Sequence, residues 1–378
     1  MGPSNRIHFP ALRVPISALA LDATEGRFLL QGTTHVCLFD LDSEESGSMT
    51  NASEKRLLPL QTSARYIDCI LEIQSQFRHS KSISSLVWWP QDTGAFLSAS
   101  YDASVVLWDT ETMEPSRVFR IQDRVYDLSV SPTATHTLIA SATKATLYDL
   151  GGTQSHYLRL VDARTRHQDA ILAVEWSPRD EYILASGGLD GLVHLWDVRS
   201  ARSKLMSLSK NDPLEMNSLN PKPPRAHDGI VNGLAFTLSG DRLVSTGSDG
   251  TPRLWDMATG KDCQVIYQAS LTNRDTTVHI FNVHSGEAVR PPLGPLMRPI
   301  SSIAWRPRRE QLVIAGSDGD MYLFEPPIPL SSYTQTSSRD PQLLEGTGRR
   351  TRRVAAASIT SLASLEQQEE EEEEDDWS

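Results

Sequence analysis

Residues 171–201 read ILAVEWSPRDEYILASGGLDGLVHLWDVRSA. Short alternating runs of apolar residues predict three strands, at residues 171–176, 182–186 and 192–196. Turn-forming residues separate these runs, and a fourth strand is expected to follow Asp197. The stretch therefore predicts one small antiparallel sheet of four strands.

A fixed spacing of four residue types occurs in this stretch and in two others. In each copy a His is followed 28 or 29 residues later by a Trp–Asp pair, with a Ser and an Asp between them. The Ser stands four residues before the Asp, and the Asp stands six residues before the Trp. Four residue types kept in phase across three segments predict a repeat array. The three sets are His79, Ser98, Asp102 and Trp108; His167, Ser186, Asp190 and Trp196; and His227, Ser245, Asp249 and Trp255.

The chemistry of these sets has two interpretations. In the structural one, the indole N–H donates to the hydroxyl, the hydroxyl contacts the imidazole, and the imidazole donates to the carboxylate. Every polar group is then satisfied inside a buried sheet. A catalytic Ser-His-Asp triad is the alternative, but each of the three copies also carries a Trp partner. We therefore interpret the sets as structural tetrads and expect no catalytic residue.

An aromatic residue followed by an acid or its amide recurs seven times along the chain. A closed ring of such sheets is a β-propeller, so we predict an all-β propeller of about seven blades. One interval, from Asp256 to Asn282, spans only 26 residues. A full blade needs roughly 40 residues, so the sixth blade is expected to be truncated, with a third strand at residues 277–281. The seven pairs are Phe39–Asp40, Trp108–Asp109, Tyr148–Asp149, Trp196–Asp197, Trp255–Asp256, Phe281–Asn282 and Phe324–Glu325.

Composition shifts suggest the domain boundaries. The net charge is −12, and nine acidic groups lie within residues 366–376, so the rest of the chain carries only −3. A nearly neutral folded part does not favour direct nucleic-acid binding. A basic cluster resembles a nuclear import signal, and we expect a nuclear protein. The expected parts are a short N-terminal segment, 1–15; a propeller, 16–326, with loops 42–56 and 209–226; and a disordered tail, 327–378, with the basic cluster 349–353 and the acidic run 366–376.

Several classes of protein are not favoured. No apolar run approaches the roughly 18 residues of a membrane span, and the N-terminus lacks the pattern of a secretory signal. The three cysteines, Cys37, Cys69 and Cys263, are far apart in sequence, which fits a reducing compartment. Metal-ligand spacings, a phosphate-binding glycine loop and a nucleophile elbow are not found in the sequence, so no enzyme, cofactor or metal site is expected.

The chain resembles the WD-repeat family and, within it, the Cockayne syndrome A group. The resemblance is carried by WWPQDTG at residues 88–94, by residues 171–201, by VNGL at 231–234 and by SGE at 285–287. It implies the substrate-recognition subunit of a cullin-4-type E3 ubiquitin ligase in transcription-coupled nucleotide excision repair. The implied partners are the damage-binding adaptor subunit of that ligase and proteins associated with repair and with stalled RNA polymerase.

The resemblance also points to an adaptor-binding motif, Trp-Asp-x-Arg, which falls on Trp196, Asp197, Val198 and Arg199. Trp196 is expected in the core, while Asp197 and Arg199 are expected on the bottom rim, where a bidentate guanidinium contact suits a partner. An ion pair within the blade is the alternative. Members of the group carry an N-terminal helical segment, whereas first-blade sequence here begins by Ile16 and follows three prolines.

The opposite, top face is the expected substrate face, since loops before first strands and between second and third strands meet there. A general WD-repeat scaffold and a propeller that binds damaged DNA directly remain the alternatives. A DNA-binding propeller would need a basic top face with aromatic residues, and Arg306 would contribute to it together with Arg124, Tyr126 and Arg298. The candidate positions on this face are Arg124, Tyr126, Gln168, Asp228 and Arg298.

Overall fold

The structure is a computed structural model whose described residues carry the propeller. The tail 327–378, with its clusters 349–353 and 366–376, lies outside them, as do most of the loops 42–56 and 209–226. The described ranges are 7–8, 15–22, 26–42, 65–66, 69–121, 123–132, 138–141, 146–149, 157–159, 170–199, 204–210, 225–267, 276–289, 292–293, 299–306, 309–317 and 319–324.

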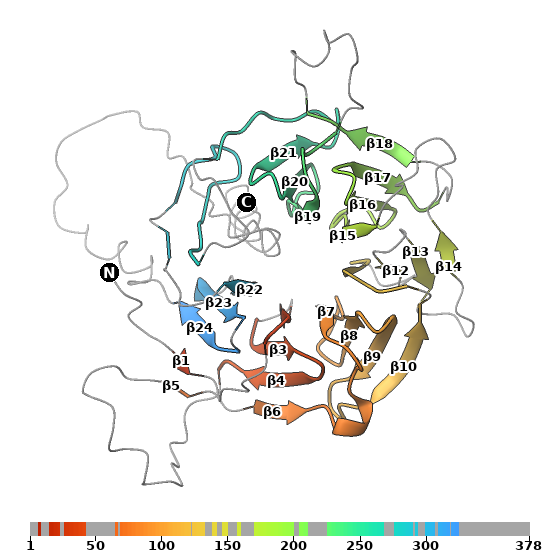
Figure 1. Cartoon of the computed structure of the whole chain (residues 1–378), viewed down its shortest axis with the longest axis vertical. Coiled ribbons are helices and arrows are strands. Elements are labelled where there is room, and N and C mark those ends of the chain that lie inside the picture. The colour runs from red at the N-terminus through yellow and green to blue at the C-terminus, as the bar shows by residue number, and fades with distance from the viewer. Residues whose placement is uncertain are drawn as a thin grey trace, which may run out of the picture.

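Six antiparallel sheets stand side by side around a central axis (Figure 1). The first strand of a blade lies near the axis and the last lies at the rim, because each blade is a meander of consecutive strands. Blade 1 comprises β2 (Ala18–Leu21), β3 (Phe28–Gly32), β4 (Val36–Asp40) and β6 (Cys69–Glu72); blade 2 comprises β7 (Ile83–Trp88), β8 (Ala95–Ser100), β9 (Ser104–Asp109) and β10 (Pro115–Arg120).

Blades 3 and 4 also have four strands, whereas blade 5 and the last blade have three described strands each. Blade 3 comprises β11 (Leu128–Val130), β12 (Leu138–Ser141), β13 (Thr146–Asp149) and β14 (Tyr157–Arg159), and blade 4 comprises β15 (Ile171–Trp176), β16 (Ile183–Gly188), β17 (Val193–Asp197) and β18 (Lys204–Leu208). Blade 5 comprises β19 (Val231–Phe236), β20 (Arg242–Gly247) and β21 (Pro252–Asp256), and the last blade comprises β22 (Ile300–Arg306), β23 (Gln311–Gly316) and β24 (Met321–Phe324).

The strands of blade 4 fall within two residues of the sequence prediction. Ile183 pairs with Asp197, so the expected hairpin of second and third strands has formed. A turn containing Gly191, at φ +75°, connects them, and a Cβ there would lie 2.5 Å from the backbone oxygen of His227. Only glycine fits this close approach of blade 5 to blade 4.

The hydrophobic core is divided among the gaps between neighbouring blades. Ala185 and Val193 of blade 4, for example, pack with Val231, Leu234 and Trp255 of blade 5, and all five are buried. Each sheet thus covers the apolar face of the next, so an isolated blade would leave one face uncovered.

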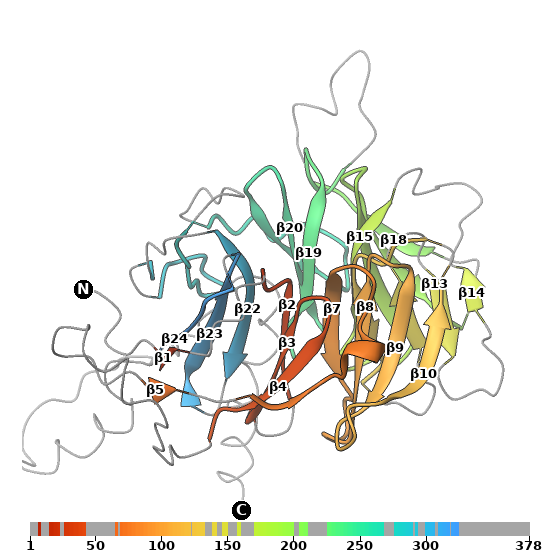
Figure 2. The same ribbon diagram turned by 60° about the horizontal axis from the view of Figure 1, so that its bottom comes forward.

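The ring closes by packing of blade 1 against the last blade (Figures 1 and 2). Leu29 and Phe39 of blade 1 share a buried cluster with Val313 and Leu323. The backbone N–H of Leu19 donates to Ser302 Oγ at 3.1 Å, so a hydrogen bond also crosses this seam. The remaining described strands, β1 (Ile7–His8) and β5 (Arg65–Tyr66), pair with each other in parallel beside the seam.

The expected number of blades, seven, is wrong for the part of the chain that the structure describes. Six sheets of three or four strands are present. The described residues between Asp256 and Pro299 include no strand, and the expected strand at 277–281 is reduced to single bridges at Val278 and Phe281. The 26-residue interval noted above is too short to supply the preceding strands, and a strand without a paired neighbour does not persist.

This irregular segment still fills the space between its neighbours. Val278 and Ile280 pack against the core of the last blade, whereas Phe281 and Val283 pack against blade 5. The segment therefore continues the ring by side-chain packing where a regular sheet is lacking. The described residues include a 3-10 turn, Ser75–Phe77, and no helix among them is long and apolar enough to cross a membrane.

Candidate functional site

The tetrad of blade 2 forms a continuous chain of hydrogen bonds. The indole Nε1 of Trp108 donates to Ser98 Oγ at 2.7 Å, and the same hydroxyl lies 2.7 Å from His79 Nε2. On the other side of the ring, Nδ1 lies 3.0 Å from a carboxylate oxygen of Asp102. A single tautomer satisfies all these contacts, with Nδ1–H donating to the carboxylate and Nε2 accepting from the hydroxyl. Because Ser98 is fully buried, this group has no access to a substrate.

Blade 5 repeats the arrangement with nearly the same distances. Trp255 Nε1 donates to Ser245 Oγ at 2.8 Å, and that hydroxyl lies 2.7 Å from His227 Nε2. Both carboxylate oxygens of Asp249 lie 3.1 Å from Nδ1. Desolvation raises the pKa of Asp249, but the hydrogen bond and charge of His227, together with hydrogen bonds from Thr251, outweigh it and hold this pKa well below its usual range.

In blade 4, Trp196 Nε1 donates to Ser186 Oγ at 2.8 Å, and Asp190 accepts from the backbone N–H of Leu192 at 3.0 Å. His167 lies outside the described residues. Trp196 is 2% exposed and therefore lies in the core, where it cannot contact a partner directly. It instead fixes the turn that follows it, which contains Asp197 and Arg199.

This turn presents a charged and aromatic group at the rim. The guanidinium of Arg199 forks onto Asp197, with Nε donating to Oδ1 at 2.9 Å and Nη2 donating to Oδ2 at 2.6 Å. The same guanidinium lies over the ring of Tyr182, 4.6 Å from its centroid. The predicted alternative, an ion pair within the blade, is thus present, and the side chain of Arg199 is nonetheless 59% exposed.

The corresponding turns of blades 2 and 5 have a different chemistry. Asp109 Oδ1 accepts from the backbone N–H groups of Glu111 and Thr112, and Asp256 Oδ1 does the same for Ala258 and Thr259. These carboxylates stabilise the turn and hold no cation by a forked contact. Two described turns of this kind present a forked and stacked guanidinium. In blade 1, Arg27 forks onto Asp40 at 2.9 and 2.6 Å and lies 5.2 Å from the centroid of the Phe28 ring. The turn of blade 4 differs in that its arginine belongs to the sequence Trp-Asp-x-Arg.

The expected substrate face is only partly described. Arg124 is exposed and Tyr126 is half-buried. The ring of Tyr126 meets that of Tyr101 edge-on, with the two ring centroids 5.7 Å apart. Asp228 is exposed and bound by Lys210 at 2.7 Å. Gln168 and Arg298 lie outside the described residues. The face therefore offers an aromatic pair beside single charges of both signs.

The expectation that Arg306 could contribute to a basic DNA-binding face is wrong. Arg306 is 2% exposed and lies at the seam between blade 1 and the last blade. Its guanidinium donates to Asp42 at 2.6 Å and to Gln311 at 2.8 Å. A buried and paired guanidinium cannot contact a phosphate backbone, because the seam would have to open first.

Two carboxylates near the axis were missed by sequence reasoning. Asp127, which precedes β11, accepts from the backbone N–H of Leu128 at 2.9 Å and from that of Val174 in blade 4 at 3.1 Å. Desolvation raises the pKa of Asp127 to about 6, and desolvation with repulsion from Asp127 raises the pKa of Glu175 to about 8. Because 48 residues separate the two carboxylates, only the stacking of inner strands brings them together.

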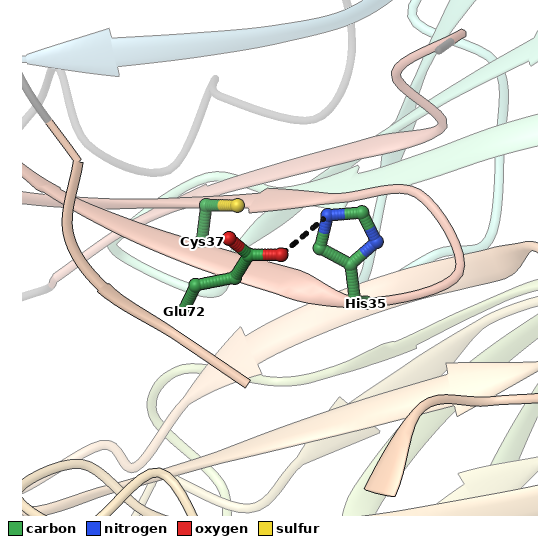
Figure 3. Close-up of side chains that lie close together, drawn as sticks. All are labelled: His35, Cys37 and Glu72. Carbon is green, nitrogen blue, oxygen red and sulfur yellow. Dashed lines mark ion pairs between the residues drawn. The ribbon is translucent and has the colours of Figure 1, made fainter. Parts of the chain in front are cut away.

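A second missed group lies in the outer half of blade 1, where His35, Cys37 and Glu72 cluster (Figure 3). Sequence reasoning found no Cys/His cluster because it considered spacing along the chain alone. The available signal was the spacing His35-x-Cys37 shortly before the Phe39–Asp40 pair, because residues two apart in an extended segment lie on one face. The partner residues come from β6, after a long connection.

Comparison with known proteins agrees with the geometry. Residues 71–109, 159–197 and 222–256 match the WD domain, G-beta repeat family. Together with the radial sheets and the recurring polar sets, these matches show that the chain contains WD repeats within an all-β propeller fold.

Three curated proteins are similar to large parts of the chain. It is 29% identical over 341 residues to the WD repeat-containing protein ATCSA-1 of Arabidopsis thaliana, covering 70% of this chain and 71% of that protein. It is 25% identical over 204 residues to radiation-sensitive protein 28 of Saccharomyces cerevisiae, covering 47% and 38%. Pre-mRNA-processing factor 17 of the same yeast is 23% identical over 288 residues, covering 68% and 56%.

Proposed function

We propose that the chain is the substrate-recognition subunit of a cullin-4-type E3 ubiquitin ligase that acts in transcription-coupled nucleotide excision repair in the nucleus. Similarity to ATCSA-1 along 70% of the chain, and to a yeast protein named for radiation sensitivity, supports a repair role. The observation that carries the ligase role is the guanidinium of Arg199, which is exposed and held in a fixed orientation on a rim turn.

The rim turn has the properties of a docking anchor for the damage-binding adaptor. Arg199 donates to Asp197 through Nε and Nη2, and a guanidinium has five N–H donors, so other donors remain for a partner. Fixing by Asp197 and by the ring of Tyr182 reduces the conformational entropy that Arg199 would lose on binding. Arginine and tyrosine are also the residue types enriched among interface anchors.

The proposal assigns no chemistry to this chain. The polar sets that resemble a catalytic triad are buried and fully engaged in blades 2 and 5. The propeller would instead hold proteins associated with repair or with stalled RNA polymerase on its top face, around Arg124, Tyr126 and Asp228, together with Gln168 and Arg298. The ligase bound at the opposite rim would then transfer ubiquitin to them.

The test is binding of the purified full chain to the damage-binding adaptor, compared with the Arg199→Asp and Arg199→Ala variants. We expect a loss of at least about tenfold in affinity for Arg199→Ala, or about 1.4 kcal/mol, and a larger loss for the charge reversal. Arg117→Ala is the matched control, because Arg117 also lies over an aromatic ring, that of Phe119, but on an outer strand of blade 2.

Unchanged affinity of Arg199→Asp, with an unchanged unfolding midpoint, would refute adaptor docking at this rim. Direct binding of damaged DNA is distinguished by titration with a lesion-bearing duplex at two salt concentrations. That alternative requires tight binding that weakens steeply with salt, whereas the ligase proposal expects little binding at either concentration.

A further inference from the structure

The outer half of blade 1 contains a cluster of metal-ligating side chains on one face of the sheet. Cys37 and Glu72 are directly paired across β4 and β6, and His35 lies two residues before Cys37, on the same face. A ring nitrogen of His35, the sulfur of Cys37 and a carboxylate oxygen of Glu72 all lie within 4.8 Å of one another (Figure 3). The group therefore combines nitrogen, sulfur and oxygen ligands.

A second thiol extends the cluster. Cys69 is paired with Phe39, which lies two residues after Cys37, so its side chain lies on the same face of the sheet as that of Cys37. Cys69 also donates to the backbone oxygen of Leu71 at 3.1 Å. Both cysteines are free thiols, as they would have to be to bind a metal. Four potential ligands thus come from β4, from β6 and from the hairpin that precedes β4.

His35 is the residue whose bonding is incomplete. Its Nδ1 lies 3.1 Å from Thr33 Oγ1, which fixes the ring plane. Its Nε2 is buried and has no hydrogen bond, although Glu72 Oε1 approaches to 3.2 Å. A buried polar atom without a hydrogen bond is rare in folded proteins and calls for an explanation. An imidazole anchored through one nitrogen, with the other directed at a thiol and a carboxylate, is the usual arrangement of a metal-bound histidine.

We infer that His35, Cys37, Cys69 and Glu72 form a binding site for one zinc ion on the outer strands of blade 1. Zinc is favoured because it accepts this mixture of nitrogen, sulfur and oxygen ligands in tetrahedral geometry. Ligands at about 2.0–2.3 Å from a tetrahedral ion lie about 3.6 Å apart, so the cluster must contract by rotation of side chains. Three of the ligand atoms, those of His35, Cys37 and Glu72, already lie within 4.8 Å of one another, and Cys69 lies on the same face of the sheet through its pairing with Phe39.

The main competitor of the metal is Arg78, which donates to Glu72 Oε1 at 2.9 Å. Both partners of that ion pair are about two-fifths exposed, and ion pairs of such exposure contribute little stability. Glu72 can therefore rotate a carboxylate oxygen toward the ion, and its exposure also gives the metal a path from solvent. Binding would displace the thiol protons, so the affinity for zinc is expected to rise with pH.

The test uses the purified full chain, reduced and stripped of metal with a chelator. Zinc is titrated in competition with a chromophoric chelator, and cobalt(II) serves as a spectroscopic probe of the same site. We expect one zinc per chain, a thiolate-to-cobalt charge-transfer band and a rise in the unfolding midpoint on addition of zinc. Cys37→Ser should abolish the charge-transfer band or reduce it strongly, and Glu72→Gln should weaken zinc binding at least about tenfold.

Matched controls are available for both substitutions. Cys263→Ser removes the third cysteine, which lies near Arg242 in blade 5, and Glu111→Gln alters an exposed carboxylate of blade 2; neither should change zinc affinity. Glu72 is exposed, so its variant tests the site even if Cys37→Ser is poorly folded. Zinc binding that is unaffected by Glu72→Gln, or that is lost equally in Cys263→Ser, would overturn the inference. A Cys37–Cys69 disulfide in the unreduced chain, combined with no zinc binding after reduction, would also overturn it and indicate a redox pair instead.

Discussion

Blades 1 and 2 each bury a histidine, but the two imidazoles differ in how completely they are hydrogen-bonded. In blade 2, His79 contacts Ser98 at one ring nitrogen and Asp102 at the other. In blade 1, His35 contacts Thr33 at Nδ1, whereas its Nε2 has no hydrogen bond and lies 3.2 Å from Glu72 Oε1 (Figure 3). A buried imidazole with both nitrogens bonded acts as framework, whereas one with a nitrogen to spare among thiols and a carboxylate can bind a ligand.

The difference arises from where each histidine lies in its blade. His79 precedes the first strand of blade 2, and the repeated spacing places a Ser on the second strand and an Asp in the next turn to meet it. His35 lies in the hairpin between the second and third strands of blade 1, where its neighbours are Cys37 and the outer residue Glu72. The tetrad is therefore a property of the repeat, while the His35 cluster is particular to one blade.

The largest effect is expected on removing the hydroxyl at the centre of a filled tetrad. Ser245→Ala would leave the buried nitrogens of Trp255 and His227 without partners, so we expect a loss of about 3 kcal/mol in the free energy of unfolding. Urea unfolding measures this loss. The control is Ser248→Ala, which removes an exposed hydroxyl that accepts from Ile230 N and should cost about 1 kcal/mol or less. Equal costs for the two variants would mean that the tetrad is not a framework element.

The spacing of the tetrads made the strands and the buried polar contacts predictable from sequence, because both depend on short-range repetition. The number of blades was not predictable in the same way. Asn282 accepts from the backbone N–H groups of His284 and Ser285, just as Asp109 and Asp256 accept at their own turns. An aromatic–acid pair therefore marks such a turn, and at Phe281–Asn282 the pair recurs although the described residues around it form no strand.

The two missed clusters depend on contacts that no local pattern encodes. Cys37 and Cys69 meet only because β4 pairs with β6 across a long connection. Asp127 and Glu175 meet only because the inner strands of blades 3 and 4 stack at the axis. A single sequence specifies which residues alternate along a strand, but the register of distant strands is set by the packing of the whole ring.

A smaller effect on the free energy of unfolding is expected when the pH is changed, because His79 of the blade 2 tetrad titrates. Burial lowers the pKa of His79 below its usual 6.5, although Asp102 opposes this shift. Below about pH 6.5 the unfolded chain thus binds a proton that the folded chain does not, so stability falls on acidification by up to about 1.4 kcal/mol per pH unit. We expect His79→Gln to be less sensitive between pH 6.5 and 5 than the wild type. Urea unfolding at several pH values measures both slopes.

Asp127 and Glu175 change the stability in the opposite direction to His79 over the same pH range. Because the pKa values of Asp127 and Glu175 are raised, the folded chain holds protons that the unfolded chain has lost, and acidification from pH 8 stabilises it. This contribution is common to the wild type and His79→Gln, so it cancels when one slope is subtracted from the other. Identical slopes would indicate that His79 is protonated equally in the folded and unfolded states.

The smallest effect on the free energy of unfolding is expected for His35, whose Nε2 has no hydrogen bond. In metal-free protein, His35→Leu removes a buried nitrogen that has no hydrogen bond, so the change in the free energy of unfolding should stay within about 1 kcal/mol. The equivalent change at the filled site, His79→Leu, strands Ser98 and Asp102 and should cost about 2–3 kcal/mol. Unfolding curves of both variants in the presence of chelator test the comparison directly. If His35→Leu costs as much as His79→Leu, the imidazole of blade 1 is framework too, and its spare nitrogen no longer distinguishes a ligand site from a structural one.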